Sequence, residues 1–220
     1  MSLYTSQRKA MVDSQIHPSG VIDGRILEAF AQTPREMFVP ESRKPMAYND
    51  EDLSFKDGRF IVEPSVHARM IQALEPRDGH VVLDVGCTRG YSSAILSRLV
   101  TTVIALEQKQ TYLTEAQKSW DELDVCNIAS FKGSLKKGAP DYAPYDLIVI
   151  NGSVATIPEA IAQQLTDGGK MVSILRKPGQ RMGQVMLTKH LGEGRVSSHP
   201  LFDAASPYLI GFEPAKEFAF

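Results

Sequence analysis

Short apolar runs alternate with amphipathic stretches through the middle of the chain. The apolar runs are typical of buried strands and lie at residues 80–85, 101–107, 127–131, 145–151 and 169–175. Apolar positions at helical spacing predict helices over residues 64–74, 91–100, 111–124 and 157–165, the last closed by Asp167-Gly168-Gly169. Such alternation indicates an α/β fold, with a parallel sheet and helices on both of its faces.

The two ends of the chain differ from this middle part. Residues 1–63 are interrupted by prolines and look irregular, with a helix expected at 23–32 and a long ordered loop with two short strands at 35–63. Beyond residue 176, two apolar runs flank Gly192–Gly194, which predicts an antiparallel hairpin at the sheet edge. We expect one domain over residues 1–220, made of an N-terminal helical or lid region (1–63), a cofactor-binding core (64–175) and a C-terminal β hairpin (176–220).

Composition and charge restrict the class of protein. The 220 residues are 43% hydrophobic and 23% charged, which is enough for one sizeable core. A formal net charge of -2 gives no basic footprint for nucleic acid, and no apolar stretch approaches the roughly 20 residues of a membrane span. Cys87 and Cys126 form no CxxC pair, and the first residues lack a signal-peptide core. We expect a cytoplasmic protein with no nucleic-acid or membrane partner.

The clearest chemical motif is the glycine turn that follows the first core strand and reads DVGCTRGYSSAIL over residues 84–96. Gly86 and Gly90 do not match the G-x-G-x-x-G of dinucleotide-binding folds, and the turn lacks the G-K-[ST] of a P-loop. Glu107 ends the next strand, about 20 residues further on, where a carboxylate can accept both hydroxyls of a ribose. A ligand with a ribose and a positive charge but no phosphate suits this set, and S-adenosylmethionine is such a ligand. An ordinary strand–turn–helix with a surface Glu is the alternative.

Several segments in chain order resemble the protein-L-isoaspartate O-methyltransferase family of S-adenosylmethionine enzymes. They span roughly residues 11–175 and read MVDSQI, ILEAFAQTPREMFVP, AYNDEDL, VLDVGCTRGYSSAILSRLV and APYDLIVINGSVATIPEAIAQQLTDGGKMV. The resemblance implies a seven-stranded, Rossmann-like methyltransferase sheet with a C-terminal antiparallel hairpin. It also implies S-adenosyl-L-methionine as cofactor and, as substrate, a protein or peptide carboxylate, namely that of isoaspartyl residues in damaged proteins.

The resemblance also implies which residues form the site. The cofactor positions are Asp84, Gly86, Thr88, Gly90, Glu107 and Ser134. The positions of the catalytic loop are Val62, where the family has its serine, and Glu63, and the loop's other substrate positions are Phe60 and Ile61. His67 is the histidine that we expect to line the cleft. Asn151 ends the fourth core strand, and carboxyl ends of strands line the ligand crevice in such sheets. No histidine has the spacing of a metal ligand.

Several positions depart from the family pattern. The family's substrate loop reads Thr-Ile-Ser-Gln-Pro, whereas this chain has FIVEP, so Val62 removes a hydroxyl and Glu63 adds a carboxylate. Thr88 replaces the second glycine of the cofactor loop and is tolerated if its φ is negative. Ser134 replaces an Asp that contacts adenine.

These departures leave two functions open. Loss of one orienting hydrogen bond to a charged group costs about 1.5–3 kcal/mol and need not abolish methyl transfer. A second carboxylate at Glu63 disfavours an anionic acceptor unless one of the two is protonated, or unless Glu63 faces solvent. The chain is therefore either a carboxyl methyltransferase for isoaspartate or a related acceptor, or a non-catalytic or altered-substrate family member that acts as a binding or interaction module.

Overall fold

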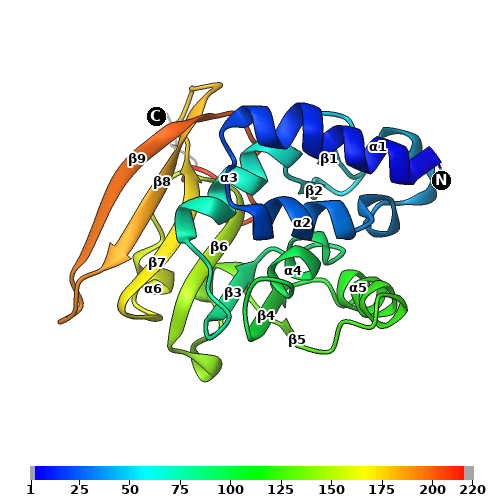
Figure 1. The fold of residues 1–220 in the computed structure, drawn as a ribbon. Coiled ribbons are helices and arrows are strands. Elements are labelled where there is room, and N and C mark those ends of the chain that lie inside the picture. The colour runs from blue at the N-terminus through cyan, green and yellow to red at the C-terminus, as the bar shows by residue number, and fades with distance from the viewer. Residues whose placement is uncertain (1–2, 216–220) are drawn as a thin grey trace.

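A mixed sheet of seven strands carries the fold of residues 3–215, which are those that the computed structural model describes (Figure 1). Its strands are β3 (Val81–Val85), β4 (Thr102–Glu107), β5 (Ile128–Lys132), β6 (Tyr145–Val154), β7 (Leu165–Leu175), β8 (Gly183–His190) and β9 (Val196–Ala204). They lie in the order β5-β4-β3-β6-β7-β8-β9. Pairing is parallel from β5 to β7 and antiparallel from β7 to β9. The predicted α/β sheet and its edge hairpin are thus confirmed.

The longer helices lie on one side of the sheet. They are α1 (Leu3–Met11), α2 (Gly24–Gln32), α3 (Pro64–Leu74), α4 (Tyr91–Leu96) and α5 (Gln110–Glu122). Of these, α3, α4 and α5 contact the strands, and α1 and α2 pack on other helices. Alternate strand residues point to opposite faces, so Val82 and Val103 join the core under these helices. Leu83 and Ile104 point the other way into a second apolar core. Buried residues on both faces explain the nearly continuous apolar runs of the sequence.

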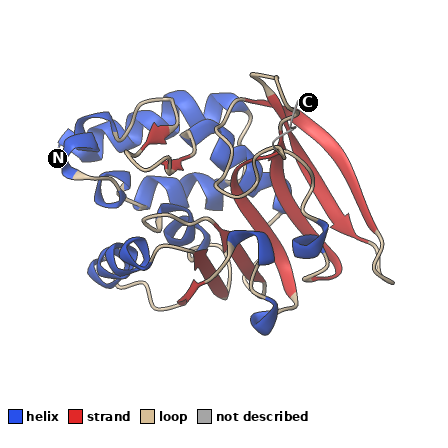
Figure 2. Ribbon diagram, turned by 180° about the vertical axis from the view of Figure 1, so that it is seen from behind, coloured by secondary structure: helices blue, strands red, loops and turns tan. Residues whose placement is uncertain are grey.

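The opposite face is covered by shorter elements (Figure 2). They are α6 (Glu159–Ala162), two single turns at Leu135–Lys137 and Pro140–Tyr142, and the C-terminal segment that contributes Leu209 and Phe212. The helix predicted over residues 157–165 is therefore wrong in extent, and Asp167-Gly168-Gly169 lies inside β7 instead of closing a helix. The cause is local: the Tyr145 N–H donates to the Gln164 carbonyl at 2.8 Å, which returns the chain to the sheet after one helical turn.

The N-terminal region is more regular than its sequence predicts. Helix α1 runs directly into a π-helical turn at Val12–Ile16, and Met11 is the one residue of α1 that is buried. A helix with so little apolar periodicity gives a weak sequence signal. The loop that follows α2 is ordered as expected and holds the antiparallel strands β1 (Leu53–Ser54) and β2 (Phe60–Ile61).

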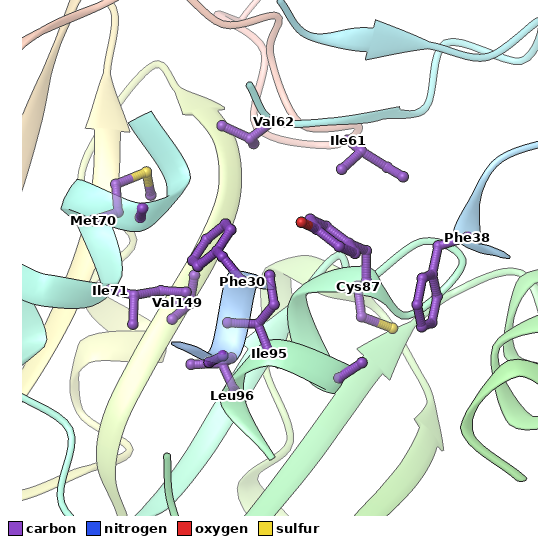
Figure 3. Close-up of a cluster of buried hydrophobic side chains, with 14 of the residues drawn as sticks. Phe30, Phe38, Ile61, Val62, Met70, Ile71, Cys87, Ile95, Leu96 and Val149 are labelled. Atoms are coloured by element: carbon purple, nitrogen blue, oxygen red, sulfur yellow. The ribbon is translucent and has the colours of Figure 1, made fainter. Parts of the chain in front are cut away.

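The loop around these two strands, residues 53–63, packs on the side of the sheet that carries the longer helices. We call it the lid segment. Figure 3 shows Ile61 and Val62 of this segment pointing into the apolar cluster that contains Phe30 of α2 and Met70 and Ile71 of α3. Both lid side chains are less than a tenth exposed. The lid segment is therefore held down by apolar packing and not only by its backbone. Within residues 3–215, no helix is long and apolar enough to cross a membrane.

Candidate cofactor and acceptor site

The carboxyl ends of β3, β4 and β6 meet at the glycine turn, residues 86–90. The sheet order reverses here, because β4 and β6 lie on the two sides of β3. Ligands of open α/β sheets bind at such a position. Gly86 has a φ of 78° and Gly90 a φ of 90°, so both need the left-handed backbone that glycine adopts without strain. The sequence motif therefore forms the expected tight turn between strand and helix.

Thr88 does not meet the condition that would make it a neutral replacement for glycine. Its φ is 53°, which for a β-branched residue is a strained conformation. Its hydroxyl donates to the carbonyls of Gly86 at 3.1 Å and Phe60 at 3.2 Å. The bond to Phe60 ties the glycine turn to the lid segment. The strained Thr88 therefore helps to hold the lid segment in place.

Glu107 ends β4 beside this turn and is fully buried. One carboxylate oxygen accepts the backbone N–H groups of Gln108 at 2.8 Å and Lys109 at 3.2 Å. The other accepts the Thr88 N–H at 3.1 Å and is bonded to the guanidinium of Arg59. The ribose position expected of Glu107 is therefore held by a side chain of the lid segment.

Arg59 is the residue of this site that the sequence analysis missed. It is 1% exposed, and its ion pair with Glu107 is buried on both sides. A single Arg in a loop of mixed composition carries no spacing or periodicity that would indicate such a contact. The one available signal was chemical: a cation directly before the substrate loop, in a site organised around a carboxylate.

Apolar side chains fill the rest of the space above the turn. We call this space, bounded by Gly86, Gly152 and Glu107, the cradle. A methyl group added at Gly86 would lie 2.8 Å from Leu209 Cδ1, and one added at Gly152 would lie 2.7 Å from the Phe60 ring. Leu209 is fixed there by backbone bonds that its segment makes with Ser153. Both glycines therefore allow lid and C-terminal residues to approach the cradle closely.

Among residues 3–215, a small cavity lies beside the glycine turn. Its volume is about 10 Å³, which is enough for a single water molecule. Its walls are Phe60, Ile61, Val62, His67, Gly86, Cys87, Thr88, Tyr91, Ser92 and Asn151. The structure thus brings together the expected substrate positions and part of the glycine turn.

Asp84 is satisfied entirely by its own neighbours. Its carboxylate accepts from Ser92 at 2.9 Å, from Ser93 at 2.5 Å and from the amide of Asn151 at 2.5 Å. Burial raises the pKa of Asp84, and these three bonds oppose that shift. Asn151 is therefore committed to Asp84 and to the Val85 carbonyl, which it contacts at 3.1 Å, and fixes the end of β6 to the end of β3.

His67 lies at the inner wall of the small cavity as a neutral imidazole. Its Nε2 is 3.2 Å from the Ser92 hydroxyl, and its ring packs edge-on to Phe30. Burial lowers its pKa to about 3. Burial also raises the pKa of the Cys87 thiol well above its ordinary value, so Cys87 is a protonated core residue and no nucleophile.

Ser134 and Glu63 lie outside the lining of the small cavity. Ser134 is exposed just beyond β5, next to Gly133, whose N–H donates to the Glu107 carbonyl at 3.1 Å. Glu63 is half-buried, and its carboxylate accepts from Ser65 at the start of α3. Burial raises the pKa of Glu63. Neither side chain contacts the small cavity, so Glu63 does not oppose an acceptor at that point.

Asp52 fixes the backbone of the lid segment. It also makes the stability of the folded protein depend on pH. Its carboxylate accepts the Glu63 N–H at 2.8 Å, and burial raises its pKa to about 6. The folded protein therefore holds a proton that the unfolded chain releases between about pH 4 and pH 6. The free energy of unfolding contributed by this group falls as pH rises through that window.

We expect Asp52→Asn to stabilise the protein at pH 7 by about 1–3 kcal/mol, since each pKa unit corresponds to about 1.4 kcal/mol. The amide oxygen keeps the bond to Glu63, and the charge is gone. At pH 4 the two proteins should unfold at the same urea concentration. Asp141→Asn, at an exposed position, should change neither value. An Asp52→Asn protein that is less stable than the wild type at pH 7 would contradict this role.

The residues do not fit S-adenosylmethionine in the arrangement that the structure shows. Small-molecule sites have volumes of about 300–1,000 Å³, far above the volume left here. The Glu107 carboxylate, moreover, is already bonded to Arg59 and to three N–H groups. Within the described residues, no cluster of His, Cys, Asp and Glu could hold a metal ion.

A family model described as protein-L-isoaspartate(D-aspartate) O-methyltransferase (PCMT) matches residues 6–202. The protein-L-isoaspartate O-methyltransferase of Roseiflexus castenholzii is 33% identical over 208 residues, which are 94% of this chain and 94% of that one. The enzyme of the same name from Methanoculleus marisnigri is 34% identical over 205 residues, or 93% of this chain and 92% of that one.

Two solved structures share the fold over nearly the whole chain. One, a protein-L-isoaspartate O-methyltransferase, has a TM-score of 0.79 at 25% identity, covering 93% of this chain and 66% of that one. The other is a protein-L-isoaspartate O-methyltransferase of Plasmodium falciparum in complex with S-adenosyl-L-homocysteine. Its TM-score is 0.75 at 18% identity, covering 92% of this chain and 97% of that one, so it supports the fold alone.

Proposed function

The chain belongs to the protein-L-isoaspartate O-methyltransferase family of S-adenosylmethionine-dependent methyltransferases, and from this premise we propose that it methylates a carboxylate of isoaspartyl or related residues in proteins. The observation that carries the proposal is Glu107. A buried carboxylate at the end of the second core strand, beside a glycine turn, is where a ribose is held in folds of this kind. We propose S-adenosyl-L-methionine as the ligand of this position once Arg59 has left it.

The proposed roles of the other residues follow from their places. Gly86 and Gly90 give the turn its close backbone approach, and Asp84 fixes the turn to α4 and β6. Ser134, exposed beyond β5, is free to contact an adenine at the rim. The acceptor loop is the part of the lid segment from Phe60 to Glu63, with His67 and Asn151 behind it.

We propose that residues 3–63 act as the lid region over the core of residues 64–175, with the hairpin region of residues 176–215 completing one domain; residues 1–2 and 216–220 of the expected domain lie outside the described residues. A protein or peptide carboxylate is the proposed substrate. The small negative net charge supports a protein without a nucleic-acid partner. We propose a cytoplasmic location, which the two free cysteines Cys87 and Cys126 support.

One observation favours a second function. The cradle is closed by the chain itself, and the cavity that is left has about 10 Å³. A family member that keeps this arrangement permanently would be a non-catalytic binding or interaction module. Methyl transfer separates the two functions, because the module transfers none.

We expect the wild-type protein to form a base-labile methyl ester on a peptide with one isoaspartyl residue when tritiated S-adenosylmethionine is supplied at saturation. The same peptide with ordinary aspartate should stay unlabelled. Glu107→Gln should reduce labelling about 10- to 100-fold, because a hydrogen bond to a charged group contributes about 1.5–3 kcal/mol. Circular dichroism should show that this variant is folded. Absence of labelled ester at any cofactor concentration would favour the binding module.

A further inference from the structure

We propose that the buried ion pair of Arg59 with Glu107 is a built-in plug, which holds the lid segment on the cradle and keeps the cofactor out until it breaks. The inference deepens the proposed function and rests on it for the identity of the excluded ligand. It concerns this chain's own Arg59, a lid residue to which the family resemblance assigned no role.

The charges of the pair support the plug. Arg59 and Glu107 are 1% and 0% exposed, so each charge is removed from water and depends on the other. The Nη1 atom of Arg59 is buried and finds no partner among residues 3–215. The guanidinium is therefore hydrogen-bonded mainly by the Glu107 carboxylate. A ribose diol would need the same carboxylate.

The contacts around Arg59 place its whole loop on the glycine turn. The Phe60 carbonyl accepts from the Thr88 hydroxyl at 3.2 Å. On the other side of Arg59, Asp57 accepts from the Tyr112 hydroxyl of α5 at 2.7 Å and pairs with Lys109. The lid is thus anchored to the turn after β3 and to the turn after β4. These are the two turns between which the cofactor position lies.

The positions of the filling atoms agree with exclusion. Arg59 Nη2 lies 3.5 Å from where a methyl group on Gly86 would be, and Leu209 Cδ1 lies 2.8 Å from it. Any ligand that approaches the Gly86 backbone meets these atoms first. Cofactor and plug are therefore mutually exclusive on Glu107.

Exclusion of this kind weakens the apparent affinity for the cofactor. The apparent Kd equals the intrinsic Kd divided by the fraction of molecules in which the plug is open. Arg59→Met removes the charge and the guanidinium and keeps an unbranched apolar stem. It should therefore raise the open fraction and tighten binding.

The test is titration calorimetry with S-adenosylhomocysteine on the wild type, on Arg59→Met and on Arg195→Met. The last is a matched substitution in an exposed ion pair with Glu193. We expect Arg59→Met to bind at least about 10-fold more tightly than the wild type, with Arg195→Met equal to the wild type. Wild-type affinity equal to that of Arg59→Met would overturn the plug and leave the proposed function intact.

Amide hydrogen exchange without ligand tests the plug separately from the identity of the proposed cofactor. The Phe55 N–H donates to the Arg59 carbonyl at 2.6 Å and the Glu63 N–H donates to Asp52, so both report on the lid segment. We expect them to exchange at least about 10-fold faster in Arg59→Met than in the wild type or in Arg195→Met. Unchanged exchange would overturn the plug. Faster exchange without any binding of S-adenosylhomocysteine would support the plug and refute the proposed cofactor.

Discussion

Arg59→Met should unfold with a free energy about 3–5 kcal/mol below that of the wild type, although the residue lies in a loop. The substitution leaves the Glu107 carboxylate without its cation, so the variant either keeps an unpaired buried charge or gives up the closed lid, and breaking a buried pair by removing one partner costs about this much. The three N–H groups that also contact Glu107 moderate the loss but do not replace a positive charge. Urea unfolding followed by circular dichroism at pH 7 measures the difference.

Two further variants decide whether loss of the buried ion pair causes the loss of stability in Arg59→Met. In Arg59→Met combined with Glu107→Gln, no charge is left unpaired, so the double variant should recover at least half of the lost stability. Arg195→Met removes an exposed pair and should change stability by less than about 1 kcal/mol. Equal losses in Arg59→Met and Arg195→Met would contradict a stabilising pair at Glu107.

Gly90→Ala should have a comparably large effect, about 2–5 kcal/mol of lost stability. The new methyl group would lie 2.6 Å from Trp120 Cζ2, so the ring or the turn must move. The φ of 90° adds the cost of a left-handed backbone for a residue with a side chain. Moving Trp120 also breaks the bond from its indole N–H to the Gly90 carbonyl, which is 3.0 Å long.

A matched glycine separates backbone strain from the clash. Gly179 has a φ of 77° and open space around it, so Gly179→Ala carries the strain alone, about 1–2 kcal/mol. Trp120 is the single tryptophan of the chain, so its fluorescence reports on the glycine turn. We expect a red shift in Gly90→Ala and none in Gly179→Ala. Equal losses in the two variants would show that Trp120 does not pack on the turn as described.

The sheet was predictable from sequence because its strands are buried on both faces. Continuous apolar runs such as that ending at Val85 leave no other stable placement, and the glycines of residues 86–90 mark the end of the strand. The hairpin was predictable because Gly192–Gly194 separates two strand-like runs. Helix α1 was missed because it buries only Met11, and α6 was overestimated because apolar residues next to a strand continue the same pattern.

The positions in the candidate site were partly predictable, but their partners were not. Glu107 could be found because a carboxylate at a strand end has a recognisable chemical use. Its pairing with Arg59 depends on how the lid segment folds over the turn, and no local pattern encodes that contact. In the same way, the sequence could only say that Thr88 is tolerated if its φ is negative. The structure shows a positive φ, so this condition is not met. The departure at Thr88 thus becomes intelligible beside Arg59, since both residues bind the lid segment to the cradle.

The most direct test is a crystal structure of Arg59→Met grown with S-adenosylhomocysteine, in which the distance between the Glu107 carboxylate and the ribose oxygens is measured. We expect both hydroxyls to donate to Glu107 at about 2.5–3.0 Å, with the side chain of residue 59 outside the cradle. A ligand bound elsewhere, or a cradle still filled by the lid segment and Leu209, would contradict the claim that Arg59 stands in for the cofactor on Glu107.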